Sequence, residues 1–564
     1  MSVNFNGINI GLRALQTQKK SLDITGHNIA NANNEAYSRQ RAVHSATTPY
    51  PVPGGNLPGG AGQVGTGVEI SQIQRIRDDF IDNQVRLESQ QSGKWNKLAE
   101  GLNRIELILN EPSDSGLAAA LDDFWSSLQD LAVFPEDPAA RSAVQQRGLA
   151  LVNCFQSIHS QLTEYKRSLN NDVTSIADEI NSYSTRIADL NRQIASIEAT
   201  GNQANDLLDT RNHLFNELNE KAAVSGYTDQ NNRLNISLGG VPLVSGIRTE
   251  ELTISKGQLP DHLYEDTVIF ATTGNQAQIN SGELAGIIET RDQTIDTYRD
   301  FLDKIAYGMA EKFNEVHRTG YNTQGEIGVD FFTVGEQKNA AAQIELSAEI
   351  RESISNIAAG NFSDNPQSVR ITALRDLTEA GYDFDPDLYE YEIRVSSDPG
   401  AADFIYNIQE ITGGQVVNEM TATVNQGIGI NTADFGFNGE FTFELQQTGE
   451  ARIFLRGSPG SGANAVALAD SLKDERVIEG EASVMKSYEA LISTLGVVGQ
   501  RSGQMVKNQE ALLTQLTNQQ QSYSGVSLDE EMANIIKYQQ AYNAAAQLIS
   551  TTNQLLDSLL AIMR

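Results

Sequence analysis

Both ends of the chain carry apolar residues at seven-residue intervals. Near the start these positions are Ile8, Leu15, Leu22 and Ile29, with Phe5 and Leu12 on the second row. Near the end they are Leu528, Ile535, Tyr542, Ile549, Leu556 and Met563, with Met532, Ala546 and Leu560 between them. So narrow an apolar seam packs against another helix and does not close a globular core by itself. The spacing therefore predicts two terminal helices that pair with each other.

The interior of the chain predicts a bundle of long helices. The clearest heptad pattern runs from Leu162 to Ile197, with apolar residues on both rows. Similar seams lie in residues 95–109, 288–316 and 484–516. Ser527 is placed to cap the last helix, whose first turn holds Asp529, Glu530 and Glu531. Helices from widely separated parts of the sequence are therefore expected to form one bundle.

Two interior segments have a different pattern. Residues 222–280 alternate apolar and polar positions, as in RLNISLGGVPLVSG, and residues 321–462 do so in YEYEIRVSS, FNGEFTFELQQ and EARIFLRG. Asn438-Gly439 is a hairpin turn signal. Residues 47–68 are dense in Pro and Gly and predict an irregular connector.

The predicted fold class is mainly α with β-rich insertions. It comprises paired N- and C-terminal coiled-coil helices, a long-helix bundle stem and outer β-rich domains. The expected divisions are an inner terminal domain (1–46 with 526–564), the connector (47–68), the stem (69–221 with 281–320 and 463–525) and the β-rich insertions (222–280 and 321–462).

Composition narrows the class of function. The net charge of −32 opposes binding to nucleic acid or to an anionic membrane. The single cysteine, Cys154, excludes an intramolecular disulfide and a cysteine-based zinc site. The sequence has neither a run of apolar residues long enough to span a membrane nor the layout of a cleaved secretory signal at its start.

No pattern in the sequence calls for catalysis. The six histidines never stand at metal-ligand spacing, and nucleophile-elbow, phosphate-loop and dinucleotide motifs are missing from the sequence. Asp383, Asp385 and Asp387 begin like a calcium loop, but Leu388 replaces the turn glycine and Arg394 the bidentate Glu. We therefore expect a non-enzymatic protein without a cofactor, with these three aspartates as a weak metal candidate.

The two terminal motifs together resemble those of a known group. SVNFNGINIGLRALQTQKKSLDITGHNIANANNEAYSRQRAV is similar to the N-terminal signature of bacterial flagellar axial proteins, and EEMANIIKYQQAYNAAA to their C-terminal signature. Within that group, NEPSDSGLAAALDDFWSSLQDLA resembles the hook-associated protein 1 family, which forms the hook–filament junction. The resemblance does not extend to residues 340–460.

The resemblance implies a structural part of the flagellum. Members are exported without a cleaved signal peptide and assemble outside the cell as a ring of subunits. The implied partners are further copies of the chain, the hook protein, hook-associated protein 3 and an export chaperone bound near the C-terminus, with no nucleic acid and no membrane insertion. The expected N-terminal interface residues are Phe5, Ile8, Leu12, Leu15, Leu22, Ile29, Asn31, Tyr37 and Arg39. The expected C-terminal assembly and chaperone residues are Leu528, Met532, Ile535, Tyr542, Ile549, Leu556, Leu560 and Met563.

The segment NIANANNEAYSRQ departs from the group's pattern at one point. The group places a Thr-Pro-Gly-like turn before the tyrosine, whereas this chain has Asn34, Glu35 and Ala36. Asn33 and Asn34 are expected to supply a left-handed conformation in its place. The segment is interpreted as the point where the inner helix ends and the chain turns toward the stem.

Two other interpretations compete with the junction subunit. One is another axial protein, such as the hook or a distal rod protein, but these usually lack so long a heptad-bearing bundle. The other is a secreted binding module or hydrolase housed in residues 340–460, where no nucleophile–base pattern occurs.

Overall fold

The computed structural model describes residues 6–49, 65–257, 266–324, 326–360, 392–397, 405–412, 415–423, 430–431, 442–443, 451–454, 462–473 and 483–562. The chain divides into two compact units. The first contains residues 1–101, 167–292 and 499–564, and the second contains residues 102–166 and 293–498. Three long helices contribute residues to both units: α2 (Asp79–Leu109), α4 (Pro138–Glu198) and α11 (Val484–Ser524).

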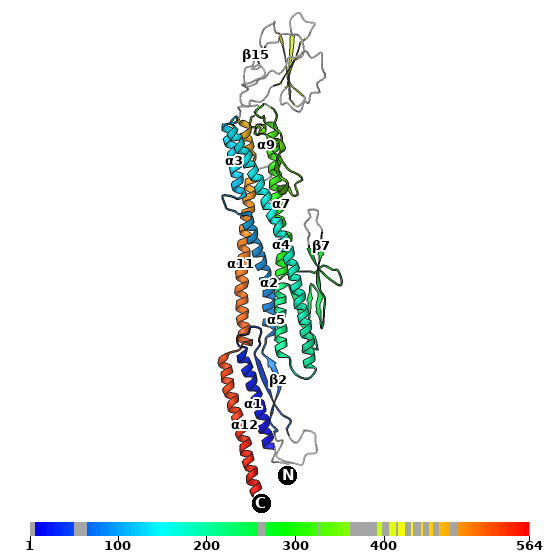
Figure 1. Cartoon of the computed structure of the whole chain (residues 1–564), viewed down its shortest axis with the longest axis vertical. Coiled ribbons are helices and arrows are strands. Elements are labelled where there is room, and N and C mark those ends of the chain that lie inside the picture. The colour runs from blue at the N-terminus through cyan, green and yellow to red at the C-terminus, as the bar shows by residue number, and fades with distance from the viewer. Residues whose placement is uncertain are drawn as a thin grey trace. The chain divides into compact units, whose positions relative to one another are not determined.

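The first unit contains both ends of the chain. Its other helices are α1 (Asn6–Ala30), α5 (Asn205–Lys221), α6 (Glu283–Glu289) and α12 (Leu528–Ile562). Its strands are β1 (Gln40–Ala46), β2 (Val68–Arg75), β3 (Val224–Thr228), β4 (Leu234–Leu238), β5 (Val241–Ser245), β6 (Arg248–Thr249), β7 (Leu252–Lys256) and β8 (Asp266–Phe270). Figure 1 shows α1 and α12 side by side, which confirms the predicted pairing of the terminal helices.

Two strands flank the predicted connector, in stretches where the sequence predicted the helical terminal domain and the helical stem. β1 and β2 pair antiparallel, with Gln40 opposite Arg75. Farther along, β3 to β6 form one antiparallel sheet, and β7 pairs with β8, as the alternation in residues 222–280 predicted. The turn between β4 and β5 uses Gly239 and Gly240, both at positive φ, which glycine adopts without a steric penalty.

Two asparagines of α4 hold these strands against the helix. Asn181 donates to the carbonyl of Leu252 and accepts from its amide, both at 2.8 Å. Asn191, which is fully buried, makes the same pair of bonds with Leu234 at 2.8 and 3.0 Å. Each side-chain amide therefore satisfies one backbone donor and one acceptor, as a neighbouring strand does.

The long heptad pattern becomes the buried face of α4. Its fully or nearly buried members are Leu162, Leu169, Val173, Ile176, Ile180, Ile187 and Ile194. Ile197, near the end of the helix, is 36% exposed. The seam therefore forms a helix-bundle core, as its period predicted.

The second unit is built around α7 and the helices that pack on it. Its helices are α3 (Leu117–Val133), α7 (Ile295–Thr319), α8 (Ala340–Gln343), α9 (Ala348–Glu352), η2 (Ile354–Asn356) and α10 (Ala463–Ser471), and η1 (Thr290–Thr294) precedes α7. Its strands are β9 (Phe332–Thr333), β10 (Glu345–Leu346), β11 (Glu392–Ser397), β12 (Ile405–Thr412), β13 (Gln415–Thr423), β14 (Ile430–Asn431), β15 (Thr442–Phe443) and β16 (Ala451–Phe454). β11 lies between β12 and β16, and β13 borders β12.

Residues 321–360 differ from the expectation of a β-rich insertion. They contain α8, α9 and η2 and only the two-residue strands β9 and β10. Ser347 caps α9 by accepting from the amide of Ile350 at 3.3 Å, and the buried Phe331 and Phe332 pack against Phe313 of α7. The segment therefore belongs to the helical core, and YEYEIRVSS and EARIFLRG supply β11 and β16. Asn438-Gly439 lies outside the described residues.

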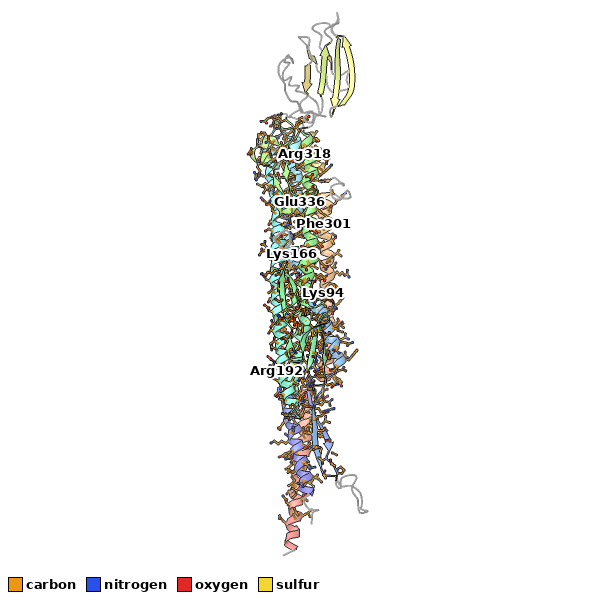
Figure 2. All side chains as sticks on the ribbon, turned by 90° about the vertical axis from the view of Figure 1, so that its right-hand side faces the viewer. Lys94, Lys166, Arg192, Phe301, Arg318 and Glu336 are labelled. Carbon is orange, nitrogen blue, oxygen red and sulfur yellow. The ribbon has the colours of Figure 1, made fainter. Side chains whose placement is uncertain are left out.

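Two buried charges in this unit, Lys166 and Asp303, have local partners. Lys166 of α4, labelled in Figure 2, is 1% exposed at its side chain and pairs with Asp296 of α7 at 2.7 Å. Asp303 of α7 accepts from the amides of Asn339 and Ala341, both at 2.9 Å, and its pKa is raised by burial. These bonds fix the chain around α8 to α7.

His317 is a buried neutral histidine in the same core. Its ring stacks on Phe313, Nδ1 bonds the carbonyl oxygen of Val329, and Nε2 accepts from the amide of Ala358 at 2.9 Å. Burial lowers the pKa of His317 to about 4. Both ring nitrogens are occupied when the imidazole is neutral, so protonation breaks the bond to Ala358.

This burial predicts a pH-dependent stability. The unfolded chain binds the proton near pH 6.5 and the folded chain only near pH 4, so stability falls as the pH drops through that interval. The loss amounts to roughly 3 kcal/mol. Chemical unfolding at pH 7 and pH 4.5 measures it, and His317→Gln is expected to flatten the dependence.

Phe313→Leu is the control, because it weakens the same core without removing a titrating group. Its stability is expected to fall equally at both pH values. An unchanged pH dependence in His317→Gln contradicts the assignment.

Candidate functional site

The terminal helices α1 and α12 run antiparallel and approach closely through two glycines. Gly7 faces Thr552 and Gly11 faces Ile549, while Asn28 at the other end of α1 bonds Glu531. A Cβ added at Gly11 would lie 2.5 Å from Cγ1 of Ile549 and 3.4 Å from the carbonyl of Ala545. Gly7 and Gly11 lie outside the apolar pattern of the sequence, although their spacing of four places both on one helix face.

The inner side of α1 is polar. Its buried side chains include Thr17, Ser21, Thr25 and Asn28. Thr17 donates to the carbonyl of Val68 at 3.2 Å, and Ser21 bonds Nε2 of His44 at 2.9 Å, so both hold the β1–β2 hairpin against the helix. The hairpin therefore attaches to α1 through hydrogen bonds.

The predicted apolar seams stay partly accessible. Ile8, Leu15, Leu22 and Ile29 on α1, and Ile535, Ile549 and Leu556 on α12, are partly buried. The clearly exposed seam residues are Leu12 (47%), Leu528 (53%), Met532 (52%) and Tyr542 (37%). Phe5 and Met563 lie outside the described residues, as does the side chain of Leu560. Much apolar surface on this helix pair is therefore left for a further contact.

Gly11→Val is expected to separate the terminal helices, because the added atoms overlap Ile549. Faster hydrogen exchange in α12 is the readout, with α4 unchanged. Gly26→Val is a matched control on the same helix, since a Cβ there meets nothing within 4 Å. Equal exchange in the two variants would falsify the close approach.

The asparagine cluster forms the turn that ends α1. Asn31 donates to the carbonyl of His27 at 3.0 Å, and Oδ1 of Asn34 accepts from the amide of Ala36 at 3.2 Å. Among the described non-glycine residues, positive φ occurs only at Asn110, Asn232 and Asn339. The expected left-handed conformation at Asn33 and Asn34 is therefore wrong. Side-chain hydrogen bonds make the turn without it.

Asn28 ties the end of α1 to the segment that follows this turn, residues 37–40, here called the strap. Its Oδ1 accepts from the hydroxyl of Tyr37 at 2.7 Å and from the amide of Gln40 at 3.0 Å. Its Nδ2 donates to the carbonyl of Gln40 at 2.9 Å and to Oε2 of Glu531 at 3.1 Å. All four hydrogen-bonding positions of this amide are used.

Ser38 fastens the strap to α5. Its amide and hydroxyl donate to the two carboxylate oxygens of Asp209 on α5, at 3.0 and 2.7 Å. Asp209 is buried and also pairs with Arg75 of β2 at 2.8 Å. Arg77 donates to the hydroxyl of Ser38 at 3.2 Å and pairs with Asp82 of α2 at 2.7 Å.

Arg39 fastens the strap to the C-terminal helix. It pairs with the buried Glu531 at 2.7 Å and with the exposed Glu530 at 2.7 Å. Its amide donates to the carbonyl of Ser524, the last residue of α11, at 2.9 Å. Ser527 lies directly before α12, and its hydroxyl accepts from the amide of Glu530 at 3.5 Å. This contact agrees with the prediction that Ser527 caps the last helix.

The electrostatics keep Tyr37 a neutral donor. Burial raises the pKa of Tyr37, and the negative charges of Asp206, Asp209 and Glu531 raise it further. Its hydroxyl proton therefore remains available for the bond to Asn28 across the accessible pH range.

Asn28→Ala is expected to lower stability by about 2–4 kcal/mol, because it leaves the buried amide and carbonyl of Gln40 without partners. Denaturant unfolding measures the change. Asn33→Ala removes an exposed asparagine from the same cluster and is expected to change stability little. A similar loss in both variants argues against the role of Asn28.

Nothing in this arrangement suggests metal chemistry. Among the described residues, no group of three or more His, Cys, Asp and Glu side chains is placed to hold a metal ion. Asp383, Asp385 and Asp387 lie outside the described residues. The site is a joint: it ties α1, α5 and α12 to one short segment.

The sequence pointed to part of this joint only. Asn31, Tyr37 and Arg39 were expected at a contact between subunits, and the structure places them at or beside the joint within one chain. Asp209 was missed because α5 carries many charged residues, and Arg75 and Arg77 were missed because no spacing distinguishes them. Glu531 was interpreted only as a helix-dipole residue, and its tertiary partner Arg39 lies 492 positions away.

In its bundle and its C-terminal helix the chain matches one class of protein, the flagellar axial proteins. A family model for the flagellar basal body rod FlgEFG protein C-terminal region matches residues 518–562, and one for the flagellar hook-associated protein FlgK helical domain matches residues 102–332. The chain is 30% identical to flagellar hook-associated protein 1 of Bacillus subtilis over 99% of this chain and 98% of that one. It therefore belongs to the flagellar hook-associated protein 1 family.

Further comparisons agree. Flagellar hook-associated protein 1 of Escherichia coli is 29% identical over 98% of this chain and 99% of its own length. The structure of the flagellar hook junction protein FlgK from Burkholderia pseudomallei matches with a TM-score of 0.58 and 18% identity, covering 78% of this chain and all of that one. This likeness supports the fold.

Proposed function

We propose that this chain is a structural subunit of the bacterial flagellum that joins the hook to the filament. It assembles as a ring of copies through α1 and α12 after export from the cell. One observation supports this proposal above all. On this helix pair, polar side chains such as Thr17 and Ser21 are buried, whereas apolar ones such as Met532 and Ile536 are more than half exposed. Such a pair gains stability when neighbouring copies cover it.

Charge supports the same assembly. Residues 6–49 and 528–562 contain six basic and six acidic side chains, although the whole chain carries a net charge of −32. These two segments, taken together, are therefore neutral, so copies approach one another without net repulsion at this layer. The excess negative charge lies elsewhere in the chain.

The further partners follow from the family. They are the hook protein and hook-associated protein 3 in the flagellum, and an export chaperone that covers Leu528–Leu560 before assembly. Among the described residues, no helix combines the length and apolar content needed to cross a bilayer. The protein acts by assembly, without catalytic turnover, and the assembly roles of the seam residues and the predicted domain boundaries belong to this proposal.

Deleting the gene is expected to leave hooks without filaments and to release unpolymerised flagellin, as seen by electron microscopy and in the medium. Complementation with Met532→Ser/Ile536→Ser is expected to fail, because it removes apolar surface that neighbouring copies would cover. The helix content is expected to be retained, because both side chains are more than half exposed in the single chain. Filament number per cell is the measurement.

Gln539→Ser/Gln540→Ser is the matched control on the same helix and is expected to restore filaments, because both side chains are exposed and polar. Normal filaments after deletion overturn the proposal. Loss of the hooks themselves favours the second candidate, a hook or distal rod protein.

A further inference from the structure

The strap contacts both sides of the break between α11 and α12. The break comprises Gly525, Val526 and Ser527. On one side the amide of Arg39 donates to the carbonyl of Ser524, and on the other its guanidinium pairs with Glu530 and Glu531. A residue near the start of the chain therefore bridges a helix break near its end.

The two buried carboxylates that bind the strap, Asp209 and Glu531, differ in what compensates them. Asp209 is bonded by Ser38 but also pairs with Arg75, which does not belong to the strap. Glu531 is 2% exposed, and the cation that pairs with it among the described residues is Arg39. Without Arg39, Glu531 keeps the amide of Asn28 and lies buried as an uncompensated charge.

A buried carboxylate without a cation favours exposure to water. Glu531 reaches water if the first turns of α12 leave α1, and the three-residue break allows that movement without unfolding α11. The Asp209 contacts are unaffected, so α1, the hairpin and α5 stay together.

We infer that Arg39 is a clamp at the α11–α12 break: its ion pair with Glu531 keeps α12 docked on α1. When Arg39 is paired with Glu531, α12 is held against α1. When this ion pair is broken, the N-terminal half of α12 is released, while the strap remains bound to α5 through Ser38. The docking of the C-terminal helix is thus controlled by the N-terminal motif of the same chain. This coupling is separate from the proposed function, since it concerns the single chain before any assembly.

Hydrogen exchange on the purified full chain tests the clamp. Arg39→Met and Glu531→Gln are compared with the wild-type chain, following peptides from residues 528–541, α5 and β1. Arg39→Met is expected to speed exchange in residues 528–541 by roughly tenfold or more, with α5 and β1 unchanged. Glu531→Gln also loses the ion pair but leaves no buried charge, so its effect is expected to be smaller.

Glu530→Gln is the matched control, because Glu530 bonds the same guanidinium from an exposed position. It is expected to change exchange less than twofold. Arg39→Met combined with Glu531→Met removes both charges and is expected to exchange more slowly than Arg39→Met alone, which keeps the inference testable if the single variant unfolds.

Two results overturn the inference. One is unchanged exchange of residues 528–541 in Arg39→Met. The other is an equal acceleration of hydrogen exchange in α5 and β1, because that result shows general unfolding and not a release of α12 at the break.

Discussion

Two buried carboxylates, Asp209 and Glu531, hold neighbouring residues of one short segment, and the terminal architecture depends on this pair of contacts. Burying a carboxylate costs several kcal/mol unless charged and hydrogen-bonding partners compensate it. Ser38 and Arg75 compensate Asp209, while Arg39 and Asn28 compensate Glu531. Because leaving either carboxylate unpaired would cost free energy, the segment is held in a single position.

The terminal pair shows the reverse of the usual distribution of polarity. Hydrogen bonds from Thr17, Ser21 and Asn28 fasten the hairpin and the strap to α1, and apolar side chains remain partly accessible outside. The polar contacts fix how α1, the hairpin and the strap are arranged within the single chain. The exposed apolar side chains remain available for contacts with other copies. Gly7 and Gly11 add the close helix approach that side chains would prevent.

The helical elements followed from sequence where the apolar period was long and regular. α4 buries Ile180, Ile187 and Ile194 as its heptads require, and α12 begins directly after Ser527. Residues 321–360 did not follow, because two-residue strands and four- or five-residue helices carry too few positions to show a period. The turn at Asn33 and Asn34 was assigned a wrong backbone conformation, since an asparagine side chain can make a turn by hydrogen bonding as well as by adopting positive φ.

The sequence by itself determined that both ends are helices with complementary seams, that the interior is a heptad-bearing bundle, and that the termini match those of flagellar axial proteins. These features are local or periodic, so they are legible without distances. Only the tertiary structure decided that Arg39 meets Glu531 and Ser38 meets Asp209. Charged and polar side chains are abundant in this chain, and no spacing along the sequence distinguishes one carboxylate from another. Folding selects these partners by burying them together.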